Sequence, residues 1–255
     1  VAMIEDLGVE IRYNTRLGRD TTIKELKQEG FEAFFIAVGA HDCYKLGVAG
    51  EEDFPQVFDA ISFLLQVSMG ERHKPGKRVA VVGGGNVAID AARTCIRLGC
   101  EDVIILYRRT RSEMPASVEE VEQAEEEGVN FAFLSLPIEV IGENGQLTGL
   151  KCLRAELGAA DKSGRRRPVP VEDSDHVYEV DAIITAIGQT TSFEGLDSLD
   201  KLKWSRRNTI MADTISGTTD EKGMFAGGDA VLGPATVVEA IGAGKFAAAG
   251  IDRYL

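Results

Sequence analysis

The residues best suited to bind a cofactor form a glycine-rich stretch about a third of the way along the chain. It begins with three consecutive glycines: Gly83, Gly84 and Gly85. Together with Ala88 they match the spacing G-x-G-x-x-A. In such a turn Gly83 permits a sharp bend, Gly85 lets the backbone approach a pyrophosphate, and Ala88 lets a helix pack close to a strand. The stretch predicts a site for the phosphates of a dinucleotide.

A dinucleotide-binding turn requires a strand before it and a helix after it, and the sequence around this stretch predicts both. The run 79–82 is uncharged and mostly β-branched, which is typical of a strand buried in a parallel sheet. From Asn86 and Val87 onward the apolar residues follow a helical period, and Gly99 stands where a glycine would end the helix. The N–H groups at the start of this helix would face the phosphates. The run 103–106 predicts the next parallel strand. The alternative is a glycine turn with a purely structural role.

The end of that next strand indicates which dinucleotide is bound. An NAD site has Asp or Glu there, roughly 20 residues beyond the turn, which binds the ribose 2′-hydroxyl. This chain has three arginines instead: Arg108, Arg109 and Arg111. A carboxylate would repel a 2′-phosphate, whereas guanidinium groups can bind one in bidentate fashion. The arginines therefore favour NADP(H), and a solvated basic turn is the structural alternative.

The composition argues against several other classes of protein. The formal charge of −13 disfavours nucleic acid or an anionic membrane as the main partner. No apolar run is long enough to span a bilayer and no signal-peptide pattern opens the chain, so we expect a cytoplasmic location. The four cysteines have no redox or metal-binding spacing. We predict neither metal ligands nor a catalytic nucleophile with its base.

Polar breakers divide the chain into three segments. A polar stretch at 74–77, unsuited to a helix or strand, precedes the strand predicted at 79–82 and marks a domain boundary. Short runs between 137 and 179 predict a small antiparallel meander, and the apolar run 182–187 predicts a return to the parallel sheet. A second boundary follows near Thr190. The predicted segments are 1–73, 74–189 and 190–255.

The last segment combines a short strand, a glycine turn and a carboxylate before a long helix. Met224–Ala226 is apolar, and Gly228 and Asp229 follow it. The stretch Ala235–Leu255 is rich in small residues but contains charged ones, including Lys245. We therefore expect a buried helix of a globular domain and not a membrane span.

These features together resemble the small (beta) subunit of NADPH-dependent glutamate synthase and its relatives, which belong to the two-dinucleotide-fold flavoproteins. The resemblance covers nearly the whole chain. It rests on the following runs: Gly83–Ala88, Tyr107–Arg109 with Glu113–Ala116, Ser163–Pro168, Ala186–Gln189 and Ala226–Asp229. The run Glu-Met-Pro-Ala after an arginine pair is specific, since no general folding rule would place it there.

The resemblance implies two cofactors and their sites. The glycine turn and the arginines would bind NADP(H). Gly188 would also contact a cofactor. Gly228 and Asp229 would bind FAD, with the Asp229 carboxylate on the ribityl chain. An ordinary turn aspartate is the alternative for Asp229. The last helix would meet the pyrimidine edge of the flavin with its first residues: Thr236, Val237 and Val238.

One departure from the family limits the prediction for FAD. Family members carry a cysteine-rich iron–sulfur region and an FAD-binding glycine turn, and neither occurs here. We therefore expect a C-terminal fragment of the α/β class. It would consist of a Rossmann-like NAD(P)-binding domain, with a parallel sheet and a small antiparallel meander, inserted in a partial FAD-binding α/β domain. FAD would bind such a fragment weakly or not at all.

The resemblance implies an NAD(P)H-dependent flavoprotein oxidoreductase that passes hydride from NADPH to FAD. In the intact protein, electrons would continue through iron–sulfur clusters to an accepting subunit, such as a glutamate synthase large subunit. One alternative is another NAD(P)H:acceptor oxidoreductase of the same build, such as a sulfide dehydrogenase or a ferredoxin:NADP oxidoreductase. A second is a non-catalytic, nucleotide-binding docking module. Hydride transfer needs no nucleophile or general base from the protein, which agrees with the lack of such a motif.

Overall fold

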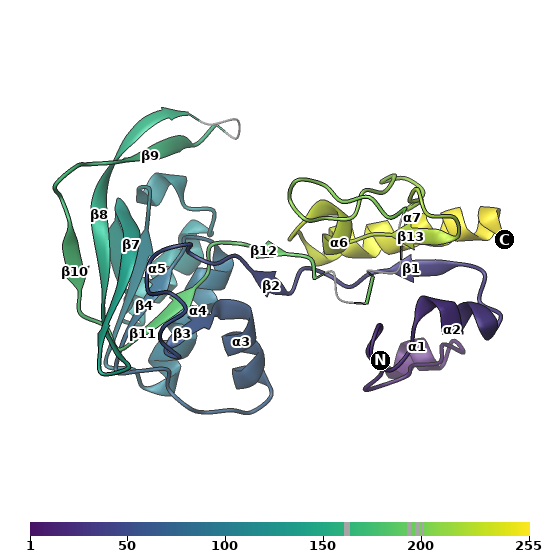
Figure 1. Ribbon diagram of the computed structural model, residues 1–255, viewed down its shortest axis with the longest axis horizontal. Helices are drawn as coiled ribbons and strands as arrows, with labels where there is room; N and C mark the ends of the chain where they lie inside the picture. Colours follow the sequence, from purple (N-terminus) through teal and green to yellow (C-terminus); the bar gives the residue numbers. More distant parts are fainter. Residues whose placement is uncertain (161–163, 193–194, 197–198, 200) are drawn as a thin grey trace. The chain divides into compact units, whose positions relative to one another are not determined.

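The chain forms two compact units, one inserted in the sequence of the other (Figure 1). The computed structural model describes residues 1–160, 164–192, 195–196, 199 and 201–255. The inserted unit is Cys43–Gly188, and the flanking unit combines Val1–Asp42 with Gln189–Leu255. Two short strands lie where the chain passes from one unit to the other: β2 (Asp42–Cys43) and β12 (Gln189–Thr190).

A parallel sheet forms the centre of the inserted unit. Its order within the described residues is β3 (Val57–Asp59), β11 (Ala182–Thr185), β4 (Arg78–Val82), β5 (Asp102–Tyr107) and β6 (Asn130–Phe133). Each neighbouring pair is parallel. The carboxyl ends of the strands therefore lie at one edge, which is where α/β sheets bind cofactors. The strands predicted at 79–82, 103–106 and 182–187 are confirmed.

Helices cover one face of this sheet. α3 (Ala60–Ser68), α4 (Asn86–Leu98) and α5 (Val118–Glu126) share a core with the sheet face that carries Val79 and Val81. The sequence fixes both ends of α4, which begins after Gly85 and stops at Gly99 in the left-handed conformation. The apolar stripe of α4 is buried, as its helical period predicts.

An antiparallel sheet covers the opposite face. β7 (Ser135–Glu143), β8 (Gln146–Ala160), β9 (Arg166–Pro170) and β10 (His176–Tyr178) make up this sheet, with β8 pairing to all the others. Leu150 and Cys152 of β8 are fully buried against Ala80 and Val82 of β4. Successive residues of β4 thus face different layers, helices on one side and the meander on the other. The predicted meander is confirmed.

The first boundary of the inserted unit lies earlier than the sequence predicts. The segment 43–73 was expected in the flanking domain, but it belongs to the inserted unit. The reason is long-range pairing: Val57 of β3 lies opposite Ile183 of β11, and Phe63 of α3 enters the core under the sheet. The boundary at 73/74 is therefore corrected to 42/43. The second boundary falls after Gly188, one residue before the expected position.

The flanking unit contains a smaller core. β1 (Phe34–Ile36) pairs in parallel with β13 (Met224–Ala226). The helices of this unit are α1 (Ala2–Glu5), α2 (Ile23–Gln28), α6 (Asp229–Leu232) and α7 (Val237–Tyr254). Met224 and Ile210 are almost completely buried in the core. Thr22 and Glu25 form a capping box at the start of α2.

The last helix, α7, differs from the expectation because most of its side chains are exposed. Among its residues only Ala247 is buried, while Val237 and Val238 are 75% and 78% exposed. The prediction of a buried helix over Ala235–Leu255 is therefore wrong. The small residues serve a close crossing on one side, since a Cβ on Gly250 would lie 2.1 Å from the carbonyl oxygen of Ser216.

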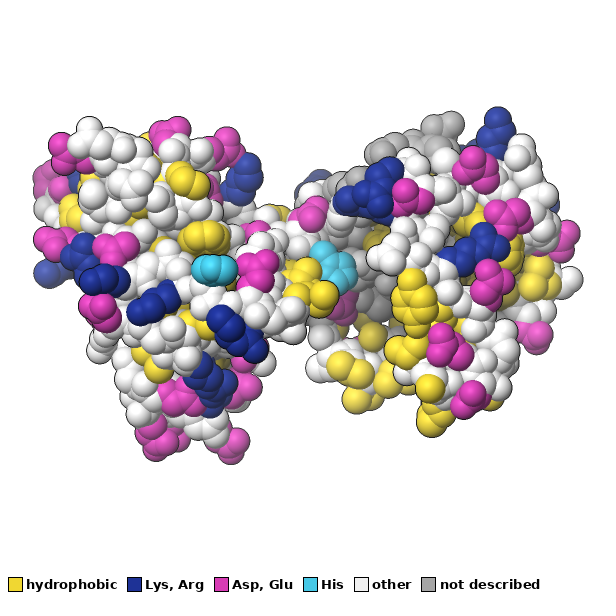
Figure 2. All heavy atoms as spheres, turned by 90° about the horizontal axis from the view of Figure 1, so that it is seen from below, with side chains coloured by type: hydrophobic (Ala, Val, Ile, Leu, Met, Phe, Trp, Pro, Cys, Tyr) yellow, Lys and Arg dark blue, Asp and Glu magenta, His cyan; other side chains and the backbone are white. Residues whose placement is uncertain are grey.

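Charged side chains are spread over the surface. Figure 2 shows acidic and basic side chains interspersed on the visible face. On that face the acidic side chains do not gather in one patch. No helix in the described part of the chain is long and apolar enough to cross a membrane.

Candidate cofactor-binding sites

The glycine turn joins β4 to α4 at the carboxyl edge of the parallel sheet, and close packing explains its first two glycines. Gly83 has a φ of +155°, and a Cβ there would lie 2.3 Å from the carbonyl oxygen of Ala186. A Cβ on Gly84 would lie 2.5 Å from the ring of Tyr107. No real side chain tolerates these distances. The backbone of the turn is therefore held against the ends of β11 and β5.

Gly85 is different, because no described protein atom explains why it is glycine. Its φ is −95°, which any residue can adopt, and a Cβ there would meet no described atom within 4 Å. A side chain would thus fit the folded protein. Its absence leaves open space directly in front of α4, where a pyrophosphate approaches the backbone in dinucleotide sites.

The N-terminus of α4 offers backbone donors to that space. Gly85 is the N-cap and has no side chain that could accept from the first turn. The N–H groups of Ala88 and Ile89 donate to the carbonyl of Gly85, at 2.9 and 3.2 Å. The N–H groups of Asn86 and Val87 have no acceptor among the described residues. Free donors and the positive end of the helix dipole suit a phosphate, so the turn fits a dinucleotide.

The loop after β5 carries the predicted arginines, and the structure places them in different surroundings. Arg108 is exposed. Arg109 is only 5% exposed, and its Nε donates to the carbonyl oxygen of Arg166 at 2.6 Å. Arg111, the first residue of the 3₁₀ helix η1 (Arg111–Glu113), forms an ion pair with Glu125. The side chain of Arg109 is therefore bonded to β9. Because Arg108 is exposed directly after β5, it is the candidate for contact with a 2′-phosphate.

The same loop contains a carboxylate, Glu113, to which the sequence assigned no role. Its Oε1 accepts from Nε and Nη2 of Arg166, at 3.0 and 2.9 Å. Its Oε2 accepts from the N–H of Thr110 at 3.2 Å. Hydrogen bonds from Thr110 and Arg166 lower the pKa of Glu113 to about 2. The sequence signals were the Glu-Met-Pro-Ala run and the run Ser163–Pro168, which contains Arg166. Neither indicated the pairing, because Arg166 lies 53 residues further along the chain.

Gly188 lies just beyond β11 and has a φ of +132°. Its carbonyl accepts from the N–H of Tyr44 at 3.1 Å, and a Cβ there would lie 3.2 Å from the Tyr44 ring. Packing against Tyr44 and the unusual φ therefore explain the glycine. Contact of Gly188 with a cofactor stays a prediction.

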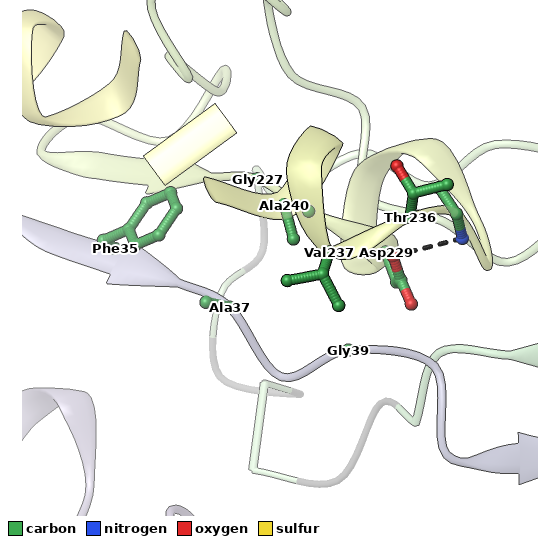
Figure 3. A pocket seen from close by; sticks show the side chains of 10 residues that line it. Phe35, Ala37, Gly39, Gly227, Asp229, Thr236, Val237 and Ala240 are labelled. Carbon is green, nitrogen blue, oxygen red and sulfur yellow. Dashed lines mark hydrogen bonds between the residues drawn. The ribbon is translucent and has the colours of Figure 1, made fainter. Parts of the chain in front are cut away.

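The flanking unit has a pocket of about 250 Å³ between β1 and the start of α7 (Figure 3). Its wall is mainly apolar or glycine, with two polar side chains, Asp229 and Thr236. The side chains of Asp229 and Val237 point toward the segment 37–39 (Figure 3). Pockets for drug-sized ligands measure about 300–1,000 Å³. This one accommodates one end of a cofactor as large as FAD.

Backbone geometry fixes the polar groups of this pocket. Gly228 has a φ of +64°, and Asp229 Oδ1 accepts from the N–H of Ala235 at 3.3 Å. Thr236 and Glu239 form a capping box, in which each side chain accepts from the other residue's N–H, at 3.3 and 2.9 Å. The bonds from Thr236 also lower the pKa of Glu239. The Thr236 hydroxyl is thus already hydrogen-bonded to Glu239 at the start of α7.

The remaining donors at the start of α7 are the N–H groups of Val237 and Val238, which have no acceptor among the described residues. A helix N-terminus favours negative charge. The arrangement therefore fits the pyrimidine edge of a reduced flavin. The Asp229 carboxylate beside it would accept hydrogen bonds from the ribityl chain. Asp229, Thr236 and Val237 line this pocket, whereas Val238 is not one of its lining residues. Binding of FAD to these residues stays a prediction.

The parallel sheet with its glycine turn defines the inserted unit as an α/β dinucleotide-binding fold. A family model described as "Pyridine nucleotide-disulphide oxidoreductase" matches residues 3–244. The chain belongs to this family of NAD(P)H-dependent flavoprotein oxidoreductases, which bind FAD and NADP.

Curated relatives match the whole chain or nearly all of it. The chain is 43% identical to "NADP(+)-dependent formate dehydrogenase subunit beta" of Moorella thermoacetica, covering 100% of this chain and 36% of that protein. It is 44% identical to "NADPH-Fe(3+) oxidoreductase subunit beta" of Geobacter sulfurreducens, covering 100% and 41%. It is 37% identical to "Glutamate synthase [NADPH] small chain" of Escherichia coli, covering 98% and 56%. The chain thus spans about a third to a half of the length of these relatives, and the resemblance to the glutamate synthase small subunit is confirmed.

Solved structures confirm the fold class. Mycobacterium tuberculosis FprA in complex with NADPH superposes with a TM-score of 0.75 and 18% identity, covering 94% of this chain and 67% of that one. Thioredoxin reductase of T. acidophilum superposes with a TM-score of 0.64 and 21% identity, covering 85% of this chain and 64% of that one. At these identities the likeness concerns the fold alone.

The open space at Gly85 makes a test of the glycine turn possible. We expect Gly85→Val to fold, because the new side chain meets no described atom, and to lose NADPH binding, because it fills the space of the pyrophosphate. Isothermal titration calorimetry and thermal unfolding measure the two effects. Gly84→Ala is the contrasting variant, since its Cβ clashes with Tyr107 and should lower the melting temperature. Unchanged NADPH affinity in Gly85→Val would show that the turn is only structural.

Proposed function

We propose that this chain is the hydride-delivering module of a flavoprotein oxidoreductase. In this proposal the inserted unit binds NADPH and the flanking unit holds the flavin end of FAD, which accepts the hydride. The observation that supports it most strongly is the turn at Gly83–Gly85, which leaves open space and free backbone donors in front of α4. Membership of the pyridine nucleotide-disulphide oxidoreductase family supports the pairing of these two cofactors.

The preference for NADPH over NADH rests on the loop after β5. No free carboxylate follows β5 directly, and Arg108 is exposed there. Glu113, the carboxylate in that loop, is bonded to Arg166 and Thr110. A guanidinium binds a 2′-phosphate through charged hydrogen bonds. We therefore propose that Arg108 binds the 2′-phosphate.

In the flanking unit, the residues proposed to hold FAD are Asp229 and the first residues of α7. The Asp229 carboxylate, held by the Ala235 N–H, would accept hydrogen bonds from the ribityl hydroxyls. The N–H groups of Val237 and Val238 would stabilise negative charge at the pyrimidine edge. No side chain is required to act as nucleophile or general base, because the protein supplies orientation and electrostatics.

We further propose that electrons leave the intact protein through iron–sulfur clusters toward a partner subunit. Support comes from the names of the relatives, two of which are beta subunits and one a small chain. The acceptor of the whole protein could be that of glutamate synthase or of another enzyme of the same build. A cytoplasmic location is also part of the proposal.

A non-catalytic docking module is the competing function. It would bind nucleotide without transferring hydride to any flavin. An assay of NADPH oxidation with an artificial acceptor, in the full-length protein supplied with FAD, separates the two. NADPH-dependent reduction of the acceptor supports the oxidoreductase, and nucleotide binding without turnover supports the docking module.

The choice of nucleotide provides a direct prediction. We expect NADPH to bind more tightly than NADH, and Arg108→Ala to remove most of the difference, at about 1.5–3 kcal/mol for each charged hydrogen bond lost. Calorimetric titration of both nucleotides measures this. Arg97→Ala is a matched control, because Arg97 is an exposed arginine of the same unit at the far end of α4, bonded to Glu127. Equal affinity of the unaltered chain for NADPH and NADH would contradict the assignment.

FAD provides a second prediction for the purified chain. The described pocket of about 250 Å³ would contact only one end of the cofactor, so we expect weak binding and a nearly colourless protein. Asp229→Ala should weaken even this binding, whereas Asp213→Ala, outside this pocket, should not. Fluorescence titration with FAD and the visible spectrum of the purified protein measure both. A stoichiometric flavin spectrum would contradict the prediction.

A further inference from the structure

A network of hydrogen bonds joins the loop after β5 to strand β9. Glu113 accepts two bonds from the Arg166 guanidinium, at 2.9 and 3.0 Å. In return, the carbonyl oxygen of Arg166 accepts from Arg109 Nε at 2.6 Å. Arg166 is thus held by its side chain and by its backbone. The two segments are 53–57 residues apart in the sequence.

This network lies directly against the glycine turn. The N–H of Ala116 donates to the carbonyl oxygen of Gly84 at 3.2 Å. The Tyr107 hydroxyl donates to the carbonyl oxygen of Glu113 at 2.7 Å, and the Tyr107 ring packs on Gly84. The segment 113–116 is therefore fastened to the turn at two points. Glu113 places a carboxylate beside the proposed nucleotide site.

That carboxylate stays charged. The Glu113 side chain is 10% exposed, so water screens it little, and its pKa is lowered to about 2. In NAD sites an Asp or Glu at the end of the second strand binds the ribose 2′-hydroxyl. A carboxylate in the loop that follows this strand would likewise repel the roughly two negative charges of a 2′-phosphate. An uncompensated Glu113 would therefore oppose NADPH. Arg166 compensates it, while its own side chain is 52% exposed.

We propose that Arg166 determines the nucleotide preference of this site by neutralising Glu113. This inference rests on the proposed NADPH site. Arg108 contacts the phosphate, and Arg166 removes the repulsion that Glu113 would exert. The β8–β9 hairpin is thereby part of the specificity element, although it lies outside the strand–turn–helix–strand motif.

The test uses single and double variants of the whole chain. We expect Arg166→Ala to weaken NADPH binding about tenfold, which is about 1.4 kcal/mol, and to change NADH binding by less than about twofold. Glu113→Gln keeps the cap on Thr110, since Gln serves in a capping box as Glu does. The double variant Arg166→Ala with Glu113→Gln should regain the NADPH affinity of the unaltered chain to within about threefold.

Arg167→Ala is the matched control, because Arg167 is the next residue of β9 and projects from its other face. It should leave both affinities unchanged. Arg166→Met retains the apolar stem and replaces Arg166→Ala if that variant melts early.

Three outcomes of calorimetry with NADPH and NADH overturn the proposal. A ratio of affinities unchanged in Arg166→Ala and Arg166→Met would mean that the pair only fastens the hairpin. A double variant as weak as the single one would mean that Arg166 binds the phosphate itself. Absence of NADPH binding in the unaltered chain would overturn the proposed function as well, and is distinguishable from the first two.

Discussion

The close contact of the glycine turn with its neighbours is the constraint on which the site of the inserted unit depends. Gly83 leaves no room for a Cβ against Ala186, and Gly84 leaves none against Tyr107. These contacts join β4 to the ends of β11 and β5, so the turn has one position. The start of α4 is then fixed at the carboxyl edge of the sheet, with its free N–H groups facing open space. Packing alone thus produces a turn that suits a phosphate, before any charged side chain is considered.

In the proposed nucleotide site, charge would then decide which phosphates are accepted. The chain carries a formal charge of −13, which disfavours anionic ligands at long range. The site compensates locally: Arg108 is exposed at the end of β5, and Glu113 is paired with Arg166. In the flanking unit the start of α7 supplies positive character through the helix dipole and the N–H groups of Val237 and Val238, which have no acceptor among the described residues.

The sequence predicted what depends on local periodicity. The predictions of β4, of α4 with its end at Gly99, and of β5 were correct, because these elements follow one another within 30 residues. The boundary at 42/43 was missed because β3 is defined by pairing with β11, and Thr185 bonds to Phe58 across 127 residues. The surroundings of Arg109 also depend on a distant segment, since its bond reaches β9. Small residues in α7 suggested a buried helix, whereas only Ala247 of α7 is buried and Gly250 crosses close to Ser216.

The central claim is that a dinucleotide phosphate binds at the backbone amides in front of α4. Nuclear magnetic resonance of the ¹⁵N-labelled chain, titrated with NADP⁺, tests it most directly. The account predicts the largest changes in amide shift at Gly85, Asn86 and Val87, with smaller changes in the loop after β5. The amide shifts of α3 near Leu65, which is exposed, should not change. Saturable binding that leaves the amides of Gly85–Val87 unshifted would contradict the account.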